Sequence, residues 1–370
     1  MISSRLGVRS VCTTIFLFVL LAVAATLAPA AIAHGGPAAH QPKVKVMTRN
    51  MYFGADLTRS VVAPTVPDFL AANSEIWTNV LHSDIPARAR LVAREIALTR
   101  PDLVGLQEVS QWLSGPVGDP AAATTVEFDQ LASLRFWLAV YGAPYRVVKS
   151  QSEIEIEAPA GAPYNKDFRL VDRDVILAPL FGSRGVTMSN PAGAQFAASL
   201  SLTNGIGQPI DITRGWVSVD VKAKGRRFRF VNTHLESFHP GIRAAQAGEL
   251  VAAAGPVGSA PGKAVLVGDI NSGPEQTAPD NIAFGVLASA GIADTWLAVN
   301  PGDPGLTCCF GELVDDPSLA GPFDERIDHV LTKGGVGVTR SRLTGLDPAN
   351  RTASGLWPSD HAGVVTTLRP

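Results

Sequence analysis

The stretch AVLVGDIN, residues 264–271, begins with apolar residues and ends in polar side chains at Asp269 and Asn271. A short apolar run of this kind is typical of a buried β-strand. The pattern recurs along the chain, where similar runs precede, contain or follow residues that can bind a metal or a phosphate. These residues are Asn50, Glu108, His234, Asp269, Asn271, Asp328, Asp360 and His361. Because sites form where the ends of strands converge in open sheets, the pattern predicts one shared cleft.

Each of these residues has an ordinary structural interpretation when it is taken alone. Glu108 could be a solvated loop acid, His234 a buried core histidine and Asp360 a turn cap. Burial of several carboxylates together without a metal would be costly, because like charges repel strongly in a low dielectric. The set is therefore more informative than its members.

The remainder of the chain alternates short β-type runs with helical patterns. Hydrophobic residues make up 46% of the 370 residues and charged residues 17%, which indicates a globular protein rather than a disordered charged chain. Apolar periodicity predicts helices at 85–98, 128–141, 242–253 and 281–290. Candidate strands fall at 44–50, 103–106, 145–148, 153–157, 175–177, 216–221, 229–232, 264–267, 327–331 and 364–368. With no internal repeat or linker, residues 43–370 are expected to form one α/β domain.

The N-terminal residues differ in kind from the rest. Arg5 and Arg9 are the only charges before residue 34, residues 11–27 are almost wholly apolar, and Ala31-Ile32-Ala33 is a small-x-small cleavage pattern. This pattern predicts a signal peptide over 1–33, a Gly-, Pro- and Ala-rich tether over 34–42, and a secreted protein. The alternative is an uncleaved anchor, although the apolar run is at the short end of the roughly 17–25 residues that span a bilayer.

Removal of the signal peptide would leave two cysteines, the adjacent pair Cys308 and Cys309. Neighbouring α-carbons lie about 3.8 Å apart, closer than ordinary disulfide geometry allows, so we expect either free thiols or a vicinal bridge. Two cysteines without nearby ligands make a poor zinc site, although one remote histidine could change that.

These motifs resemble those of the endonuclease/exonuclease/phosphatase superfamily, which includes deoxyribonuclease I, AP endonucleases, neutral sphingomyelinases and inositol polyphosphate 5-phosphatases. In the family's order they are TRN ending at Asn50, LQEV around Glu108, NTHL around His234, GDIN at 268–271, RIDHVL from Arg326 and SDH at 359–361. The resemblance spans roughly 43–369. It implies a four-layer α/β/β/α sandwich, with two mixed sheets packed face to face.

The resemblance implies a phosphoesterase that uses Mg²⁺ or Mn²⁺. Glu108 is then a metal ligand, with Asn50 and Asp360 as further ligands, direct or through water, since oxygen donors suit these hard cations. The cysteines are expected to have no catalytic part, because such an enzyme needs no covalent nucleophile.

The same resemblance assigns the proton transfer and the contacts to phosphate. His361 is the general base and Asp328 fixes its tautomer, while Asp269 orients or deprotonates the attacking water, and which of His361 and Asp269 takes the proton stays open. Asn271 and His234 donate to the phosphate oxygens.

The segment LVDRDVILAP falls where the family places a polar residue that supports the histidine at position 234. Asp172, Arg173 and Asp174 are all candidates, and we expect Asp174. The alternative is that two of them are simply exposed at a sheet edge.

The substrate is a phosphate ester that the sequence does not identify further. Ala362 and Gly363 follow SDH, where inositol polyphosphate phosphatases tend to carry a basic residue. Without the two arginines of the signal peptide the chain has 29 basic and 33 acidic residues, and this formal charge of −4 does not favour a polyanion. Nucleic acid nevertheless stays possible through a local patch of Arg226, Arg227 and Arg229.

Phospholipid is the other class of substrate, because Trp77, Trp112 and Trp357 could enter a lipid interface, although tryptophans more often lie in a core. A noncatalytic binding module on the same fold is the alternative to an enzyme. The complete motif set disfavours it. We expect a monomer without an obligate protein partner.

Overall fold

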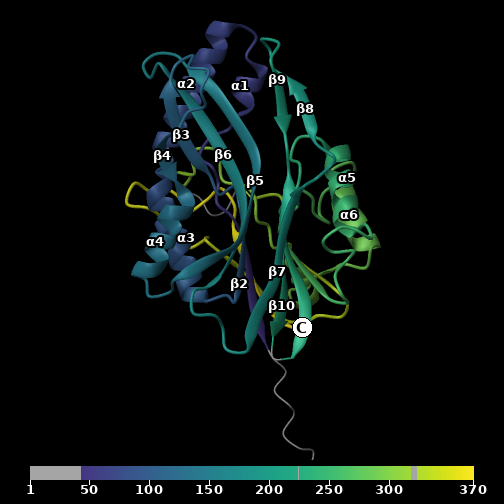
Figure 1. The fold of residues 1–370 in the computed structure, drawn as a ribbon. Coiled ribbons are helices and arrows are strands. Elements are labelled where there is room, and N and C mark those ends of the chain that lie inside the picture. Colours follow the sequence, from purple (N-terminus) through teal and green to yellow (C-terminus); the bar gives the residue numbers. More distant parts are fainter. Residues whose placement is uncertain (1–42, 224, 318–322) are drawn as a thin grey trace, which may run out of the picture. The chain divides into compact units, whose positions relative to one another are not determined.

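Two mixed β-sheets pack face to face between two outer layers of helices (Figure 1). This α/β/β/α sandwich confirms the predicted fold. The computed structural model describes residues 43–223, 225–317 and 323–370, which belong to one compact unit. The expected signal peptide and tether, residues 1–42, lie outside the described residues, so their boundaries stay predictions. No helix in the described part of the chain has the length and apolar character needed to cross a membrane.

The first sheet has eight strands in the order β15-β16-β1-β2-β6-β3-β4, and β5 also pairs with β6. The strands are β1 Val44–Asn50, β2 Leu103–Gln107, β3 Gln111–Pro116, β4 Thr125–Asp129, β5 Tyr145–Ala160, β6 Lys166–Pro179, β15 Gly337–Thr344 and β16 Gly363–Arg369. β1 and β2 are parallel, and Asn50 lies beside Gln107 in register. Their carboxyl ends therefore open at one edge of the sheet.

The second sheet has the order β13-β14-β12-β11-β10-β7. Its strands are β7 Val186–Gln195, β10 Gly215–Ala223, β11 Arg226–His234, β12 Ala264–Asp269, β13 Ala293–Asp294 and β14 Asp328–Lys333. β11 and β12 are parallel and place His234 beside Asp269, while antiparallel β14 places Asp328 on the other side of Asp269. A separate hairpin joins β8 Leu200–Thr203 to β9 Pro209–Ile212.

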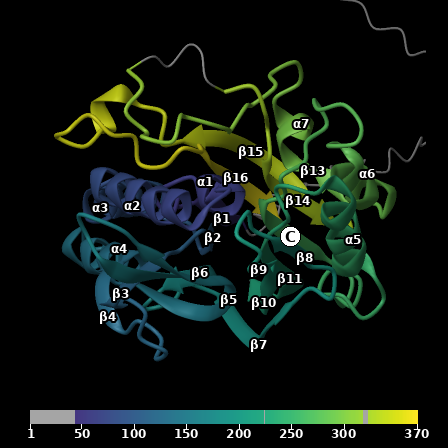
Figure 2. The same cartoon turned by 90° about the horizontal axis from the view of Figure 1, so that it is seen from above.

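The helices cover the outer faces of the two sheets (Figure 2). They are α1 Thr58–Val62, α2 Val66–His82, α3 Ile85–Thr99, α4 Gln130–Val140, α5 Pro240–Val251, α6 Ile282–Ser289 and α7 Thr295–Val299, with a 3-10 turn at Pro348–Asn350. α3 and α4 pack on the first sheet through Val92 and Leu134, whereas α5 and α6 pack on the second through Leu250 and Leu287. Each sheet thus has one apolar face toward helices and one toward the other sheet.

Local sequence sets the ends of these helices. The Asp84 side chain accepts a hydrogen bond from the backbone N–H of Ala87 at 3.2 Å and so caps α3, which ends before Pro101. The helix predicted at 128–141 begins later, because Phe128 belongs to β4 and Asp129 is the N-cap of α4.

The inner faces of the sheets meet closely at Gly105 in β2. A Cβ atom there would lie 2.4 Å from Asn232 Oδ1 and 2.5 Å from a methyl carbon of Val267. Asn232 is itself fixed, because its amide donates to the Leu106 carbonyl at 2.9 Å and its Oδ1 accepts from Gln107. The glycine of the LVGLQEV segment is therefore required by packing between the sheets.

Gly105→Ala should lower the free energy of unfolding by roughly 1–3 kcal/mol, because the added methyl group overpacks a filled interface. The matched control is Gly248→Ala in α5, where a Cβ atom meets nothing within 4 Å. Alanine in a helix interior should there stabilise the protein by about 0.5–1 kcal/mol. Urea unfolding of the three proteins measures both changes. Equal midpoints for wild type and Gly105→Ala would contradict the close packing.

Candidate active site

The strand ends of both sheets open into one cleft of about 450 Å³. Six of the eight predicted residues line it, namely Glu108, His234, Asp269, Asn271, Asp360 and His361. The other two, Asn50 and Asp328, are buried, and each is hydrogen bonded to a residue that lines the cleft. The structure therefore brings all eight together.

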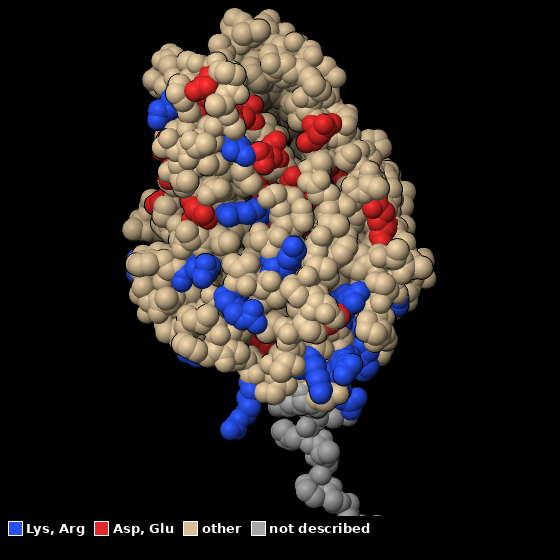
Figure 3. All heavy atoms as spheres, in the orientation of Figure 1, with Lys and Arg blue, Asp and Glu red and all other residues tan. Residues whose placement is uncertain are grey.

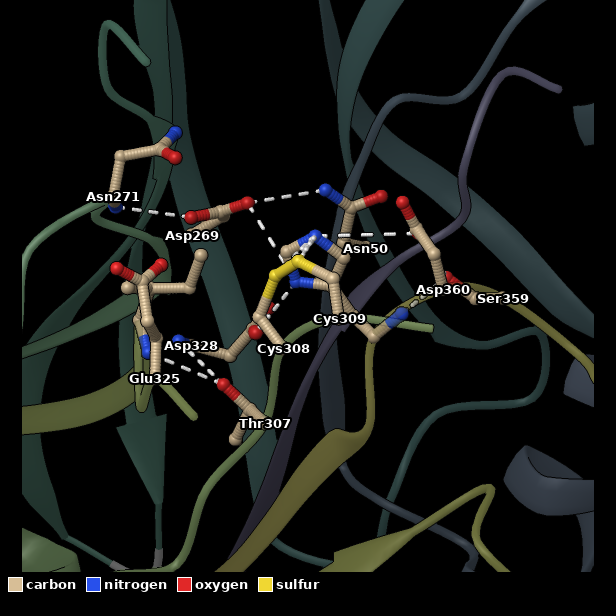
Figure 4. Close-up of a disulfide and its surroundings, with 12 residues drawn as sticks. Asn50, Asp269, Asn271, Thr307, Cys308, Cys309, Glu325, Asp328, Ser359 and Asp360 are labelled. Carbon is tan, nitrogen blue, oxygen red and sulfur yellow. Dashed lines mark hydrogen bonds and ion pairs between the residues drawn. A yellow bond between two sulfur atoms is a disulfide. The ribbon is translucent and has the colours of Figure 1, made fainter. Parts of the chain in front are cut away.

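The side chain of Asn50 joins the two sheets at the base of the cleft. Its Nδ2 donates to Asp269 Oδ2 at 3.1 Å (Figure 4) and to Glu108 Oε1 at 2.9 Å. Its Oδ1 accepts from the backbone N–H of Tyr52 at 2.8 Å. Asn50 thus positions two carboxylates from different sheets. The side-chain oxygen of Asn50 already accepts a hydrogen bond from the backbone.

Left-handed backbone turns direct side chains into the cleft after the strands end. Glu108 follows β2 with φ +54°, and Asn271 follows β12 with φ +50°. Such conformations cost about 1–3 kcal/mol for residues other than glycine and concentrate at functional sites. Both are held by hydrogen bonds: Phe53 N–H donates to Glu108 Oε2 at 3.1 Å, and Asn271 N–H donates to Asp269 Oδ1 at 2.9 Å.

His361 is oriented by the carboxylate of Asp328. The distance between His361 Nδ1 and Asp328 Oδ2 is 2.8 Å, and Asp269 Oδ2 lies 3.8 Å from the same nitrogen. Burial would lower the pKa of His361, but Asp328, Asp360 and Asp269 together raise it well above its usual value. The opposite nitrogen, Nε2, faces Asp360 at 4.0 Å.

Burial, and then the crowding of carboxylates, raises the pKa of two cleft residues. Burial, then repulsion from Asp360 and Asp172, raises the pKa of Glu108 to about 8. Burial also raises the pKa of Asp269 to about 6, although the charge of His361 opposes the shift. A divalent cation would relieve this repulsion, so the electrostatics fit a metal site.

His234 is held as a neutral imidazole by Arg214, which sequence reasoning did not single out. Arg214 Nη1 lies 2.9 Å from His234 Nδ1, and because arginine only donates, Nδ1 accepts and Nε2 carries the proton. Burial and the charge of Arg214 keep the pKa of His234 well below its usual value. Its Nε2–H lies 3.6 Å from Asp269 Oδ2, at the cleft.

Arg214 lies among the three buried carboxyl groups of Glu153, Asp172 and Asp174. Asp172 forms the ion pair, at 3.5 Å from Arg214 Nη1. The expected Asp174 is buried near the backbone N–H of His234 and near the charges of Arg214 and Asp172. Burial and repulsion from Asp174 and Asp172 raise the pKa of Glu153 to about 11, so this group holds a proton at neutral pH.

Two buried arginines hold the backbone around the cleft in place by hydrogen bonds to its carbonyl groups. Arg49, in the TRN motif, donates to the carbonyl of His361 and pairs with Glu95. Arg88 of α3 donates to the Met51 carbonyl at 3.0 Å. A buried arginine gives no periodic signal in the sequence, so its role could be found only from the structure.

His329, next to Asp328, supports the turn after β12. Arg326 Nη1 lies 3.2 Å from His329 Nδ1, and Nε2–H donates to the Ser272 carbonyl at 3.0 Å. Burial and the charge of Arg326 lower the pKa of His329 to about 4. The histidine is therefore neutral in the folded protein at neutral pH.

The depressed pKa of His329 should make stability depend on pH between about 4 and 6.5. In this window the unfolded chain binds the proton and the folded protein does not, so this group's contribution to stability falls as the pH falls. His329→Gln, which can still donate to Ser272, should remove this contribution, worth at most about 1.4 kcal/mol per pH unit. Urea unfolding across the window gives the difference in slope between the two proteins. Identical slopes would contradict the neutral buried state.

The chain belongs to the Endonuclease/Exonuclease/phosphatase family, whose sequence profile matches residues 76–361. Members of this family usually hydrolyse phosphoester bonds and generally use divalent metals. No curated protein sequence matches the chain significantly.

Solved structures share this fold at low sequence identity. D. rerio TDP2 in complex with a single-strand DNA product aligns with a TM-score of 0.52 and 15% identity over 89% of this chain and 99% of that one. An endonuclease/exonuclease/phosphatase from Beutenbergia cavernae aligns with a TM-score of 0.51 and 22% identity over 89% and 72% of the respective chains. A humanized D. rerio TDP2 aligns with a TM-score of 0.50 and 16% identity over 89% of this chain and 99% of that one. Identities this low show the fold alone.

Proposed function

We propose that this protein is a secreted, divalent-metal-dependent phosphodiesterase that uses water as its nucleophile. The observation that carries the proposal is the convergence of Glu108, Asp269 and His361 on one cleft, with Asp328 holding the histidine ring. Secretion is proposed from the pattern of residues 1–33. Protein recovered from the growth medium would then begin at His34, which N-terminal sequencing would test. We further propose that it acts as a monomer.

Glu108 and Asp360 are the residues proposed to hold the metal. Mg²⁺ is typically bound through one or two carboxylates and retains several waters, which matches these two carboxylates. Burial raises the pKa of both, and the charge of Asp360 raises that of Glu108 further. Asn50 supports this pair by its hydrogen bond to Glu108. When bound, Mg²⁺ or Mn²⁺ would supply positive charge for the phosphoryl oxygens and lower the pKa of a water.

Asp269 and His361 are proposed to handle the proton of the attacking water. Asp328 and the other carboxylates favour the protonated form of His361, so Asp269 is the better acceptor of that proton. The imidazolium of His361 would then face the charge that develops on the phosphate. Such preorganised donors stabilise the transition state because they need no reorientation during the reaction.

His234 and Asn271 are proposed to donate to the phosphate oxygens. Arg214 fixes the tautomer of His234 that carries its proton on Nε2. Asn271 Nδ2 donates to the Leu235 carbonyl at 2.9 Å, which holds the side chain at the edge of the cleft.

His361→Ala should reduce turnover of bis-p-nitrophenyl phosphate by about 10²- to 10⁴-fold, and Asp328→Asn by somewhat less, because the pair acts as a unit. His82→Ala, at the exposed end of α2, is the matched control and should retain wild-type turnover. Chelation should abolish activity, and Mg²⁺ or Mn²⁺ should restore it. Turnover that survives either His361→Ala or complete chelation would contradict the mechanism. A folded protein without metal-dependent turnover on any phosphoester would support a binding module instead.

The walls of the cleft favour a substrate that carries an apolar group. Besides the proposed catalytic residues, the cleft is lined by apolar side chains, among them Leu57, Val61, Ile154, Ile156, Ile210, Ile212 and Phe238. Among the described residues that line the cleft, Arg214 is the one Lys or Arg, and it is paired with Asp172. Acidic side chains lie around the hollow at the upper end of the face in Figure 3, whereas basic ones gather lower on that face. We therefore propose an amphiphilic phosphodiester ahead of nucleic acid.

The arginine patch and the three tryptophans suggested by the sequence as substrate contacts do not line this cleft. Arg226 and Arg227 begin the strand that ends at His234, seven to eight residues or roughly 25 Å away, and Arg229 is paired with Asp220. The tryptophans are core residues: Trp77 and Trp112 pack with Phe168, and Trp357 is fully buried. Phe238, which is 54% exposed, is the most exposed aromatic side chain among the described residues that line the cleft.

Phe238→Ala should therefore raise KM for sphingomyelin or phosphatidylcholine vesicles several-fold and leave bis-p-nitrophenyl phosphate nearly unchanged. Phe181→Ala is the matched control, because Phe181 is 88% exposed and does not line the cleft. Single-stranded DNA, RNA and plasmid are assayed beside the lipids. Faster hydrolysis of DNA or RNA than of either lipid would reverse the proposed order of substrates.

A further inference from the structure

Cys308 and Cys309 lie directly against the imidazole of His361. Their sulfur atoms are 3.7 and 3.9 Å from His361 Nε2. The two cysteines are joined in a vicinal disulfide (Figure 4). One donor atom from each of the three residues lies within 4.8 Å of the other two. Both cysteines line the cleft, and Cys309 is partly exposed, so a reductant can reach the pair.

Backbone hydrogen bonds hold this segment in place independently of the sulfur atoms. Cys308 N–H donates to the Glu325 carbonyl at 3.0 Å, Phe310 N–H to the Asp360 carbonyl at 2.7 Å, and Ala362 N–H to the Thr307 carbonyl at 2.7 Å. The Phe310 ring also stacks on Trp357 with a centroid distance of 4.5 Å. The two thiols of the reduced protein would therefore stay beside His361.

The orientation of His361 presents the correct nitrogen to these sulfur atoms. Nδ1 is bound to Asp328, which leaves Nε2 facing the cysteines. A carboxylate behind a histidine is the usual arrangement in metal sites, because it fixes the ring and strengthens the ligand. Two thiolates and one imidazole suit Zn²⁺, with a fourth position open to water, whereas Mg²⁺ and Mn²⁺ prefer oxygen donors.

We propose that Cys308, Cys309 and His361 form a zinc site that exists only when the cysteines are reduced, and that zinc bound there inhibits the enzyme. With a phosphine as reductant, the S–S bond gains two electrons. The phosphine takes the oxygen of one water to become its oxide, and the two hydrogens of that water form the thiols. Zn²⁺ then binds both sulfurs as thiolates and His361 through Nε2, and it releases three protons to solvent, two from the thiols and one from the imidazolium.

Inhibition follows because zinc occupies the His361 nitrogen that faces the cleft. The binding step is independent of the proposed function, and only the inhibition rests on it. In the disulfide form no zinc is bound, and Nε2 of His361 is available to the substrate. The site would thus link the activity of the cleft to the redox state of two residues that the hydrolytic reaction does not use.

Binding is tested without any activity assay, with Co²⁺ as the spectroscopic probe and Zn²⁺ in competition with a chromophoric chelator. Phosphine-reduced wild type should show a thiolate-to-cobalt absorption band that zinc abolishes, and the oxidised protein should show none. Asp328→Asn should weaken zinc binding by the reduced protein about 10- to 100-fold. A band of equal strength in oxidised protein, or none in reduced protein, would overturn the site. This comparison needs no cysteine substitution.

Inhibition is tested on bis-p-nitrophenyl phosphate in excess Mg²⁺. The inhibition of each protein is expressed relative to its own turnover without zinc. Zinc should inhibit reduced wild type at least tenfold more strongly than oxidised wild type. It should inhibit the reduced double variant Cys308→Ser/Cys309→Ser no more strongly than oxidised wild type. Equal inhibition of all three would mean that zinc acts by displacing Mg²⁺, and would overturn the regulatory part. Absence of turnover in every sample together with a normal cobalt band would overturn the proposed function and leave the zinc site standing.

Discussion

The hydrogen bond between Asp328 and His361 is the interaction on which the site depends, because it joins the two sheets at their shared edge. Asp328 is the first residue of β14 in the second sheet. His361 lies two residues before the start of β16 in the first sheet. The 2.8 Å contact exists only if both sheets are packed in the observed register. The geometry of the candidate site is thus a consequence of sheet packing rather than of any single loop.

The parallel strand pairs explain why so many polar residues reach one place. The first sheet contains the parallel pair β1 and β2, and the second contains the parallel pair β11 and β12. In each sheet two strands therefore end at the same edge. Asn50 then bridges the sheets by donating to Glu108 and Asp269. Asp360 repels Glu108 and Asp328 repels Asp269 at these strand ends, so repulsion between carboxylates is built into the fold, and a divalent cation would relieve it.

Much of this arrangement could be predicted from the sequence, because short apolar runs and the polar residues at their ends are local signals. α2 was missed: polar Asn73 and Ser74 lie on its buried face and interrupt the apolar period. β7 was missed because it is largely exposed and carries few apolar residues. The role of Arg214, and the contact of Cys308 with His361, depend on residues far apart in the chain. No local pattern encodes such contacts.

The crowded carboxylates of the cleft are proposed to bind a divalent cation, and an electron paramagnetic resonance titration of Mn²⁺ tests this binding most directly. Wild type should deplete the signal of free Mn²⁺ with saturation at a defined stoichiometry, and Glu108→Gln should lose this binding. Glu325→Gln, which removes a charge from the same cleft at a residue not proposed as a ligand, should retain it. Indistinguishable titrations of wild type and Glu108→Gln would contradict the account.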